Sequence, residues 1–215
     1  IFSTYHSINY ICNMELKFSF VIPVYNRPEE TEELLESFTQ LKTTQNFEIV
    51  IVEDGSTQTS KTVIDRYKSQ LNIAYYSKKN TGPGDSRNYG MQKAQGNYYI
   101  ILDSDCILPP HYLNTVYKSL SKHYVDCFGG PDAAHSSFTN LQKAINFSMT
   151  SILTTGGIRG RKKSVNTFQP RSFNMGLSKK AFQDSKGFGN IHPGEDPDLS
   201  IRLWQLGYKT KLIPE

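Results

Sequence analysis

The sequence predicts an α/β protein with a Rossmann-like, mostly parallel central sheet flanked by helices. Four strand-like segments alternate with helical patterns between residues 17 and 102, and this alternation is typical of parallel strands joined by right-handed crossovers. The fourth segment, Tyr-Tyr-Ile-Ile-Leu at residues 98–102, is apolar without interruption, as expected of a central strand covered on both faces. A chain of 215 residues is long enough to bury one sizeable core of this kind.

The first half of the chain gives the clearer pattern. Residues 17–25, Lys-Phe-Ser-Phe-Val-Ile-Pro-Val-Tyr, are rich in β-branched and aromatic residues and predict the first strand. Further strands are expected at residues 47–52, 73–76 and 97–102. The helices between them are indicated by apolar side chains at helical spacing, namely Leu34, Leu35, Phe38 and Leu41, then Val63, Ile64, Tyr67 and Leu71, and by the segment 85–94.

The second half has a looser pattern. The expected elements are a helix around residues 113–120, a strand at 126–130, a helix at 140–153, a basic loop at 154–166, a strand at 173–177 and a helix at 179–184. In the last helix, Asp196 is the expected N-cap and Pro197 the first helical residue. Its buried face is expected to contain Leu199, Leu203 and Leu206. No repeat or linker divides the chain, so a single domain is predicted.

Two carboxylates, Asp103 and Asp105, directly follow the central strand. In open α/β sheets the carboxyl ends of the strands face the ligand crevice. Carboxylate oxygens at this place can hold Mg2+ or Mn2+, and the cation can in turn hold a diphosphate. A polar turn explains an Asp-Ser-Asp sequence equally simply, and the pair alone does not decide between the two.

Other polar residues could carry chemistry, and each also has a purely structural explanation. Asp54 lies in a strand-to-helix turn, where polar residues are common. Arg87 could meet a phosphate together with free backbone N–H groups at a helix start, or it could be a solvated arginine. Asp196 could be a general base fixed by its helix, or it could serve with Glu195 as a partner of the helix dipole. The basic residues within 159–163 are solvated, cover a polyphosphate, or contact anionic lipid head groups.

Composition excludes several classes of function. A net charge of +4 with a pI near 8.8 favours phosphate-bearing partners but is too mild for a nucleic-acid-binding surface. Three cysteines without CxxC spacing predict reduced thiols, not a disulfide framework or a zinc site. No run of about 18 apolar residues occurs, so no membrane span is expected. We therefore expect a cytoplasmic protein, with peripheral contact at the inner membrane face left open.

Residues 1–13 are expected to form a non-functional N-terminal extension. They lack the basic start, apolar middle and small-residue cleavage site of a signal peptide. Met14 immediately precedes the first strand-like segment. We therefore expect the natural chain to start at Met14 and a single functional domain to span residues 14–215.

Five segments together resemble the family 2 inverting glycosyltransferases, enzymes of the GT-A fold that use nucleotide sugars. The resemblance runs from about Phe18 to Glu215, and the segments occur in the order expected of the family. They are Phe-Ser-Phe-Val-Ile-Pro-Val-Tyr-Asn-Arg at 18–27, Ile-Val-Glu-Asp-Gly-Ser at 51–56, Asn-Thr-Gly-Pro-Gly-Asp-Ser-Arg-Asn-Tyr-Gly at 80–90, Leu-Asp-Ser-Asp at 102–105 and Gly-Glu-Asp-Pro-Asp-Leu at 194–199. Each segment is weakly specific, whereas the ordered set is strongly specific.

The resemblance implies a role for individual residues. Residues 14–130 would bind the nucleotide sugar, and residues 131–215 would provide the acceptor side and the catalytic base. The implied donor contacts are Pro23, Val24 and Tyr25 around the nucleoside, Asp54 on the base, Arg87 near the base or diphosphate, Asp103 at the ribose or metal, and Asn174 beside the sugar. Asp105, with Asp103, would bind Mn2+ or Mg2+. Asp196, with Glu195 beside it, would take the proton from the acceptor hydroxyl.

The reaction implied by the resemblance is a single in-line displacement at the anomeric carbon of the donor. The base deprotonates the acceptor hydroxyl, while the metal and Arg87 stabilise the departing nucleoside diphosphate. The expected partners are a nucleotide-sugar donor, with a UDP-sugar favoured, and a glycan or lipid-linked acceptor. The expected role is therefore polysaccharide synthesis.

Two departures from the family pattern keep alternatives open. Family members often carry a histidine ligand shortly after the last helix, and the chain ends before that position, so we expect the natural protein to continue beyond Glu215. Asp85-Ser86 replaces the usual small pair and adds a negative charge near the diphosphate, unless Asp85 only caps the helix. The alternatives are an inactive nucleotide-sugar or glycan-binding module of the same fold and a sugar nucleotidyltransferase. A dinucleotide-dependent oxidoreductase is disfavoured because GxGxxG is absent after the first strand.

Overall fold

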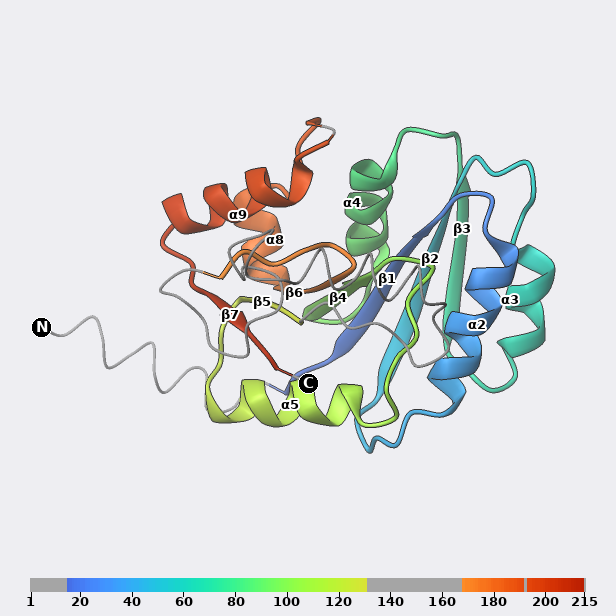
Figure 1. Ribbon diagram of the computed structural model, residues 1–215, viewed down its shortest axis with the longest axis horizontal. Helices are drawn as coiled ribbons and strands as arrows, with labels where there is room; N and C mark the ends of the chain where they lie inside the picture. Colours follow the sequence, from blue (N-terminus) through green and yellow to red (C-terminus); the bar gives the residue numbers. More distant parts are fainter. Residues whose placement is uncertain (1–14, 131–167, 192, 215) are drawn as a thin grey trace, which may run out of the picture.

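The computed structural model describes residues 15–130, 168–191 and 193–214, which form a central sheet covered by helices on both faces (Figure 1). Within these residues the strands are β1 (Phe18–Val24), β2 (Phe47–Asp54), β3 (Ile73–Lys78), β4 (Tyr98–Leu102), β5 (Cys127–Gly129), β6 (Asn174–Ser178) and β7 (Thr210–Leu212). The helices are α2 (Pro28–Thr39), α3 (Lys61–Tyr67), α4 (Pro83–Lys93), α5 (Tyr112–Lys122), α8 (Lys179–Ser185) and α9 (Glu195–Gln205).

The described strands form one sheet in the order β3-β2-β1-β4-β6-β5-β7. β1 pairs in parallel with both β2 and β4, whereas β6 is antiparallel to its neighbours β4 and β5. After β1 the chain moves outward through β2 and β3, and it then returns to the other side of β1 as β4. The sheet therefore has a topological switch point between β1 and β4, where ligands bind beyond the carboxyl ends of the strands in open α/β folds.

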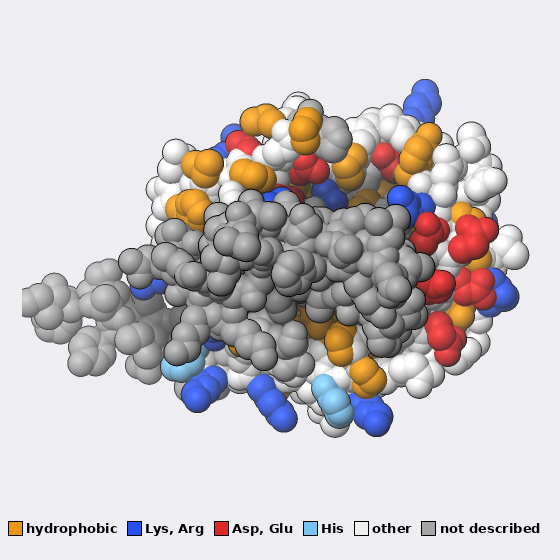
Figure 2. Space-filling view, in the orientation of Figure 1, with side chains coloured by type: hydrophobic (Ala, Val, Ile, Leu, Met, Phe, Trp, Pro, Cys, Tyr) orange, Lys and Arg blue, Asp and Glu red, His pale blue; other side chains and the backbone are white. Residues whose placement is uncertain are grey.

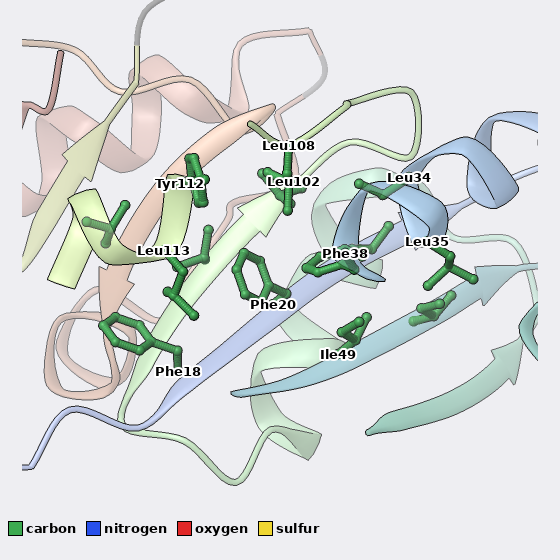
Figure 3. Close-up of a cluster of buried hydrophobic side chains, with 14 of the residues drawn as sticks. Phe18, Phe20, Leu34, Leu35, Phe38, Ile49, Leu102, Leu108, Tyr112 and Leu113 are labelled. Carbon is green, nitrogen blue, oxygen red and sulfur yellow. The ribbon is translucent and has the colours of Figure 1, made fainter. Parts of the chain in front are cut away.

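Each face of the sheet has its own apolar core. One core joins alternate residues of β1 to α2, α3 and α5, and the other packs α4, α8 and α9 against the opposite face. Figure 3 shows Phe20 of β1 in the first core, with Phe38 of α2 on one side and α5 on the other. The rings of Phe20 and Phe38 meet edge to face with centroids 4.8 Å apart, which is a favoured aromatic geometry. Because both faces are covered, every residue of β4 is buried, as predicted.

The structure confirms the α/β fold and the alternating order of the first half. Two predictions about the last helix are wrong. The N-cap is Gly194, with a φ of 123° that favours glycine, so Asp196 is the second residue of α9 and its carboxylate is free to act elsewhere. Leu206 does not share the buried face, because α9 ends before it and the residue is 52% exposed. The helix expected at 140–153 and the loop expected at 154–166 lie outside the described residues.

Further boundaries differ slightly from expectation. α4 begins at Pro83, earlier than the expected start at residue 85, because Gly82 is the N-cap and proline suits the first turn. Asp85 is therefore not the cap of this helix. β7 was not expected at all, because its three residues are too few to produce a periodic pattern.

Charge is unevenly distributed over the described surface. Figure 2 shows acidic side chains gathered over α2, whose sequence contains five glutamates, and basic and histidine side chains over α5. Among the described residues, no helix combines the length and the apolar character needed to cross a bilayer.

Candidate active site

A cavity of about 410 Å³ opens at the switch point of the sheet. The ends of β1, β2 and β4 and the loop before α4 supply its walls, which are formed by Pro23, Val24, Tyr25, Arg27, Asp54, Asn80, Gly82, Pro83, Arg87, Asp103, Ser104 and Asp105. The structure thus brings together most of the site residues predicted from the sequence. Asn174, Glu195 and Asp196 are not among the lining residues and approach the site from β6 and α9.

The turn after β1 is fixed by Asn26. Its φ of 53° lies in the left-handed region, which asparagine tolerates better than most residues. Its side-chain oxygen accepts hydrogen bonds from the backbone N–H groups of Thr57 and Gln58 at 2.7 and 2.9 Å. Asn26 therefore ties this turn to the loop after β2 and holds its neighbours, Tyr25 and Arg27, at the rim of the cavity, where both are exposed.

Asp54 is buried and organises the loop that precedes α4. Its Oδ1 accepts from the Lys78 ammonium at 2.6 Å and the Thr81 amide at 3.0 Å, and its Oδ2 accepts from the Gly82 amide at 2.9 Å. A carboxylate offers about four acceptor positions, so Oδ2 keeps one for a ligand. Asp54 therefore has a structural role, at the end of β2 and toward the loop before α4, and its contact with a base stays a prediction.

The extra negative charge of Asp85 is compensated locally. Its carboxylate accepts a hydrogen bond from the Thr81 hydroxyl and lies 3.1 Å from the Lys78 ammonium. The hydrogen bond from Thr81, together with the nearby Lys78, lowers the pKa of Asp85. Lys78 therefore serves both Asp54 and Asp85 and offsets part of the negative charge of Asp85.

Arg87 joins the two sides of the site. Its side chain is only 5% exposed, and its Nη2 donates to Asp103 Oδ1 at 2.8 Å while its Nη1 donates to Glu195 Oε1 at 3.3 Å. The guanidinium also lies over the ring of Phe188, 5.4 Å from the centroid, within the range of a cation–π contact. A residue of α4 thus links the end of β4 to the first turn of α9.

Asp103 and Asp105 form the acidic edge of the cavity. Asp105 is exposed, and its Oδ2 lies 3.6 Å from Nη1 of Arg27. The thiol of the neighbouring Cys106, whose pKa is raised to about 12 by burial, donates to the carbonyl of Phe173 at 3.3 Å. No group of three or more acidic, cysteine or histidine side chains converges among the described residues. Two carboxylates nevertheless suit Mg2+ or Mn2+, which commonly use one or two protein carboxylates and take further ligands from water and phosphate.

The carboxylate of Asp196 is held in place through one oxygen, while its other oxygen has no hydrogen-bond partner among the described residues. Its Oδ2 accepts from the Ser172 amide at 3.1 Å, whereas its Oδ1 is buried without a hydrogen-bond partner among the described residues. Burial raises the pKa of this carboxyl, which the amide of Ser172 and the charge of Arg87 partly offset. An unpaired buried acceptor is uncommon, and a raised pKa near a cleft is typical of a general base.

Asn174 begins β6 directly opposite Leu102, the residue before Asp103. Its Oδ1 accepts a hydrogen bond from the Tyr112 hydroxyl at 2.5 Å. The next residue, Met175, is buried in the core beneath α9. Asn174 therefore lies at the correct edge of the sheet, but its side chain is already bonded to α5.

The sequence reasoning missed Arg27, Asn80, Gly82, Pro83 and Ser104 as lining residues and Lys78 as the partner of Asp54. Arg27 could have been found, because it follows the carboxyl end of the first strand and such positions face the crevice. Lys78 gave no local signal, since its importance comes only from its contact with Asp54 across the sheet edge.

Comparisons with known proteins agree with this geometry. The family model described as "Glycosyl transferase family 2" matches residues 19–185. An uncharacterized glycosyltransferase of Rickettsia bellii is 42% identical over 91 residues, which are 42% of this chain and 13% of that protein. The poly(ribitol-phosphate) beta-N-acetylglucosaminyltransferase TarS of Staphylococcus aureus is 29% identical over 114 residues, which are 52% of this chain and 20% of TarS. The matched part thus covers a fifth or less of either relative.

Solved structures of glycosyltransferases share the fold. The structure of S. aureus TarS 1-349 in complex with UDP-GlcNAc has a TM-score of 0.68 at 21% identity, with 92% of this chain and 56% of that chain covered. The mannosyltransferase PcManGT from Pyrobaculum calidifontis, in complex with GDP-Man and Mn2+, has a TM-score of 0.69 at 15% identity, with 95% and 58% covered. The GT-A fold expected from the sequence is confirmed. With the family model matching most of its length, the chain belongs to glycosyl transferase family 2.

Proposed function

We propose that this chain transfers a sugar, with inversion, from a nucleotide sugar to an acceptor hydroxyl. The observation that carries the proposal is the cavity at the switch point between β1 and β4, which has Asp103 and Asp105 on its edge. The similarity to TarS, solved with UDP-GlcNAc and with UDP, supports a UDP-sugar as the donor. The mannosyltransferase solved with GDP-Man makes a GDP-sugar the second choice.

In this proposal, residues 14–130 hold the donor. Pro23, Val24 and Tyr25 surround the nucleoside, and the remaining acceptor position on Asp54 receives a hydrogen bond from the base. Asp105, with Asp103, would hold Mn2+ or Mg2+, which when bound neutralises the charge of the diphosphate. Arg27, at the same edge, adds a guanidinium suited to phosphate oxygens.

The proposed chemistry on the acceptor side belongs to Asp196. Its unpaired Oδ1 takes the proton of the acceptor hydroxyl, and its raised pKa makes the carboxylate a stronger base than an ordinary aspartate. The acceptor oxygen then bonds to the anomeric carbon as the bond from that carbon to the phosphate oxygen breaks, and the electron pair leaves with the nucleoside diphosphate. The ion pair between Glu195 and Arg87 holds the start of α9 next to the donor cavity.

The proposed acceptor and setting come from the resemblance to the family. The acceptor would be a glycan or a lipid-linked saccharide, bound between Asn174 and α9 in the half formed by residues 131–215, and the product would be a polysaccharide. We place the reaction in the cytoplasm, with peripheral contact at the inner membrane face where the acceptor is lipid-linked.

Calorimetric titration of UDP tests the donor site without knowledge of the acceptor. We expect binding with Mn2+, loss of binding with EDTA, and at least tenfold weaker binding for Asp105→Ala under Mn2+. Glu33→Ala is the matched control, because Glu33 is an exposed carboxylate of α2 outside the cavity. GDP and TDP then define the preferred base. A chain that binds none of these nucleotides contradicts the proposal, whereas binding without turnover of any nucleotide sugar favours the inactive module.

A further inference from the structure

Asn88, next to Arg87 in α4, makes an unusual pair of contacts with one distant residue. Its Nδ2 donates to the carbonyl of Phe188 at 2.8 Å, and its Oδ1 accepts from the backbone N–H of the same residue at 2.8 Å. Both functions of the amide are therefore used to hold Phe188. Only a side chain with a donor and an acceptor side by side makes this pair, and neither aspartate nor leucine supplies both. Asn88 does not line the donor cavity.

The segment that Asn88 holds, residues 185–188, is also bound by α9. Arg202 of α9 donates to the carbonyls of Gly187, at 2.7 Å, and of Ser185. Gly187 has a φ of 69°, and a Cβ at that position would come within 2.2 Å of Asn88 Oδ1. The segment is therefore fitted closely between the Asn88 amide on one side and α9 on the other.

Phe188 connects this segment to the catalytic groups. Its ring is buried in the same core as Leu199 and Leu203 of α9. The Arg87 guanidinium, which binds Glu195 at the start of α9, lies over the ring. A shift of Phe188 would therefore move the support of α9 and, with it, Asp196 in the first turn of that helix.

We propose that Asn88 is a positioning residue for the catalytic base. It fixes Phe188 so that α9 presents Asp196 at the correct distance from the donor, and it acts without touching the donor. This inference rests on the proposed function, because it assigns Asp196 as the base. A misplacement of about 1 Å far from the reacting atoms can lower a rate about 100-fold, so the contact has leverage on turnover.

The test compares Asn88→Ala with Asn97→Ala in the full chain. Asn97 is a matched control, because its amide also bridges a distant segment, donating to the Glu15 carbonyl at 2.8 Å and accepting from the Lys17 amide at 2.9 Å. It differs in lying at the amino end of β4, away from the cavity. The measurements are UDP affinity with Mn2+, and kcat and KM for the nucleotide sugar that the wild-type chain turns over.

For Asn88→Ala we expect kcat to fall about 10- to 100-fold, with UDP affinity and donor KM changed by less than about threefold. Asn97→Ala should retain kcat. Asn88→Asp keeps an acceptor for the Phe188 amide, but its second oxygen faces the Phe188 carbonyl, which it repels. The kcat of this variant should therefore also fall. Equal kcat losses in Asn88→Ala and Asn97→Ala, or a proportional loss of UDP affinity in Asn88→Ala, would overturn the inference.

A second readout keeps the inference independent of turnover. If the wild-type chain binds UDP but transfers no sugar, amide hydrogen exchange is measured for Asn88→Ala and Asn88→Asp. The amides of α9 that are hydrogen-bonded within the helix, from Asp198 onward, should exchange faster than in the wild type, while those of β4 stay protected. Unchanged protection of these α9 amides would refute the positioning role. Failure of the wild-type chain to bind any nucleotide would instead contradict the proposed function itself.

Discussion

Arg87→Met should destabilise the fold, and the burial of the two ion pairs of Arg87 determines by how much. The arginine side chain is 5% exposed, and its partners Asp103 and Glu195 are 38% and 13% exposed. Removing one partner of a fully buried pair costs about 3–5 kcal/mol, because the remaining charge is left uncompensated. The share of Asp103 is discounted, since water screens a carboxylate that is more than a third exposed. We therefore expect a loss of about 2–3 kcal/mol in the free energy of unfolding.

Urea unfolding followed by circular dichroism measures this loss. Because m is about 1–3 kcal/mol/M for small proteins, the midpoint should fall by about 1 M. Arg66→Met is the matched control: its guanidinium lies 3.0 Å from Glu32, but the two side chains are 57% and 41% exposed. That variant should lose less than about 1 kcal/mol. If Arg87→Met loses no more stability than Arg66→Met, Arg87 does not support Asp103 and Glu195 as argued.

Two further predictions concern pH and packing. Burial raises the pKa of Asp196, and a general base must be ionised to accept a proton. The acid limb of the pH profile of kcat should therefore lie above about pH 4, the ordinary pKa of aspartate. Asp196→Asn should lower kcat at least about 100-fold. Because the pKa of Asp196 is higher in the folded protein than in the unfolded chain, ionising this carboxyl lowers the free energy of unfolding of the wild type. In urea unfolding, Asp196→Asn should therefore gain stability relative to the wild type as the pH rises from the pKa of the unfolded chain through that of the folded protein. An acid limb of kcat below pH 4 would contradict both expectations. Gly90→Ala places a Cβ 2.5 Å from Val21 Cγ1. The cost of overpacking exceeds the gain in helix propensity, so the free energy of unfolding measured in urea should fall by about 1 kcal/mol. Gly84→Ala in the same helix meets only ordinary contacts and should be nearly neutral, and equal losses would refute the packing argument.

The fold was predictable because hydrophobic periodicity and strand ends are local properties of a sequence. The uninterrupted apolar run of β4 marked a strand covered on both faces, and the structure confirms it. The positions of Asp54, Asp103 and Asp105 at strand ends followed from the rule that the carboxyl ends of parallel strands share one edge. The cavity therefore lies where the sequence predicted a ligand crevice.

The remaining features depend on contacts between distant residues. Nothing near Arg87 in the sequence indicates that Glu195 is its partner, because that contact requires α9 to pack beside α4. The N-cap was placed wrongly at Asp196 because an aspartate before a proline fits the usual pattern, whereas the positive φ of Gly194 is set by the turn that precedes α9. The strand order β4-β6-β5 is likewise invisible to periodicity, which predicts strands but not their neighbours.

Because β6 pairs with β4, the central sheet can be completed only late in synthesis of the chain. β1 to β4 leave the ribosome first and can pair in parallel, but the far edge of β4 is covered only when β6 has been made. At about 5–20 residues per second, the segment between them takes several seconds to synthesise. During that time Tyr-Tyr-Ile-Ile-Leu is an unpaired apolar edge, the kind of surface that pairs with other chains. We therefore expect expression at lower temperature or with added chaperones to increase the soluble yield.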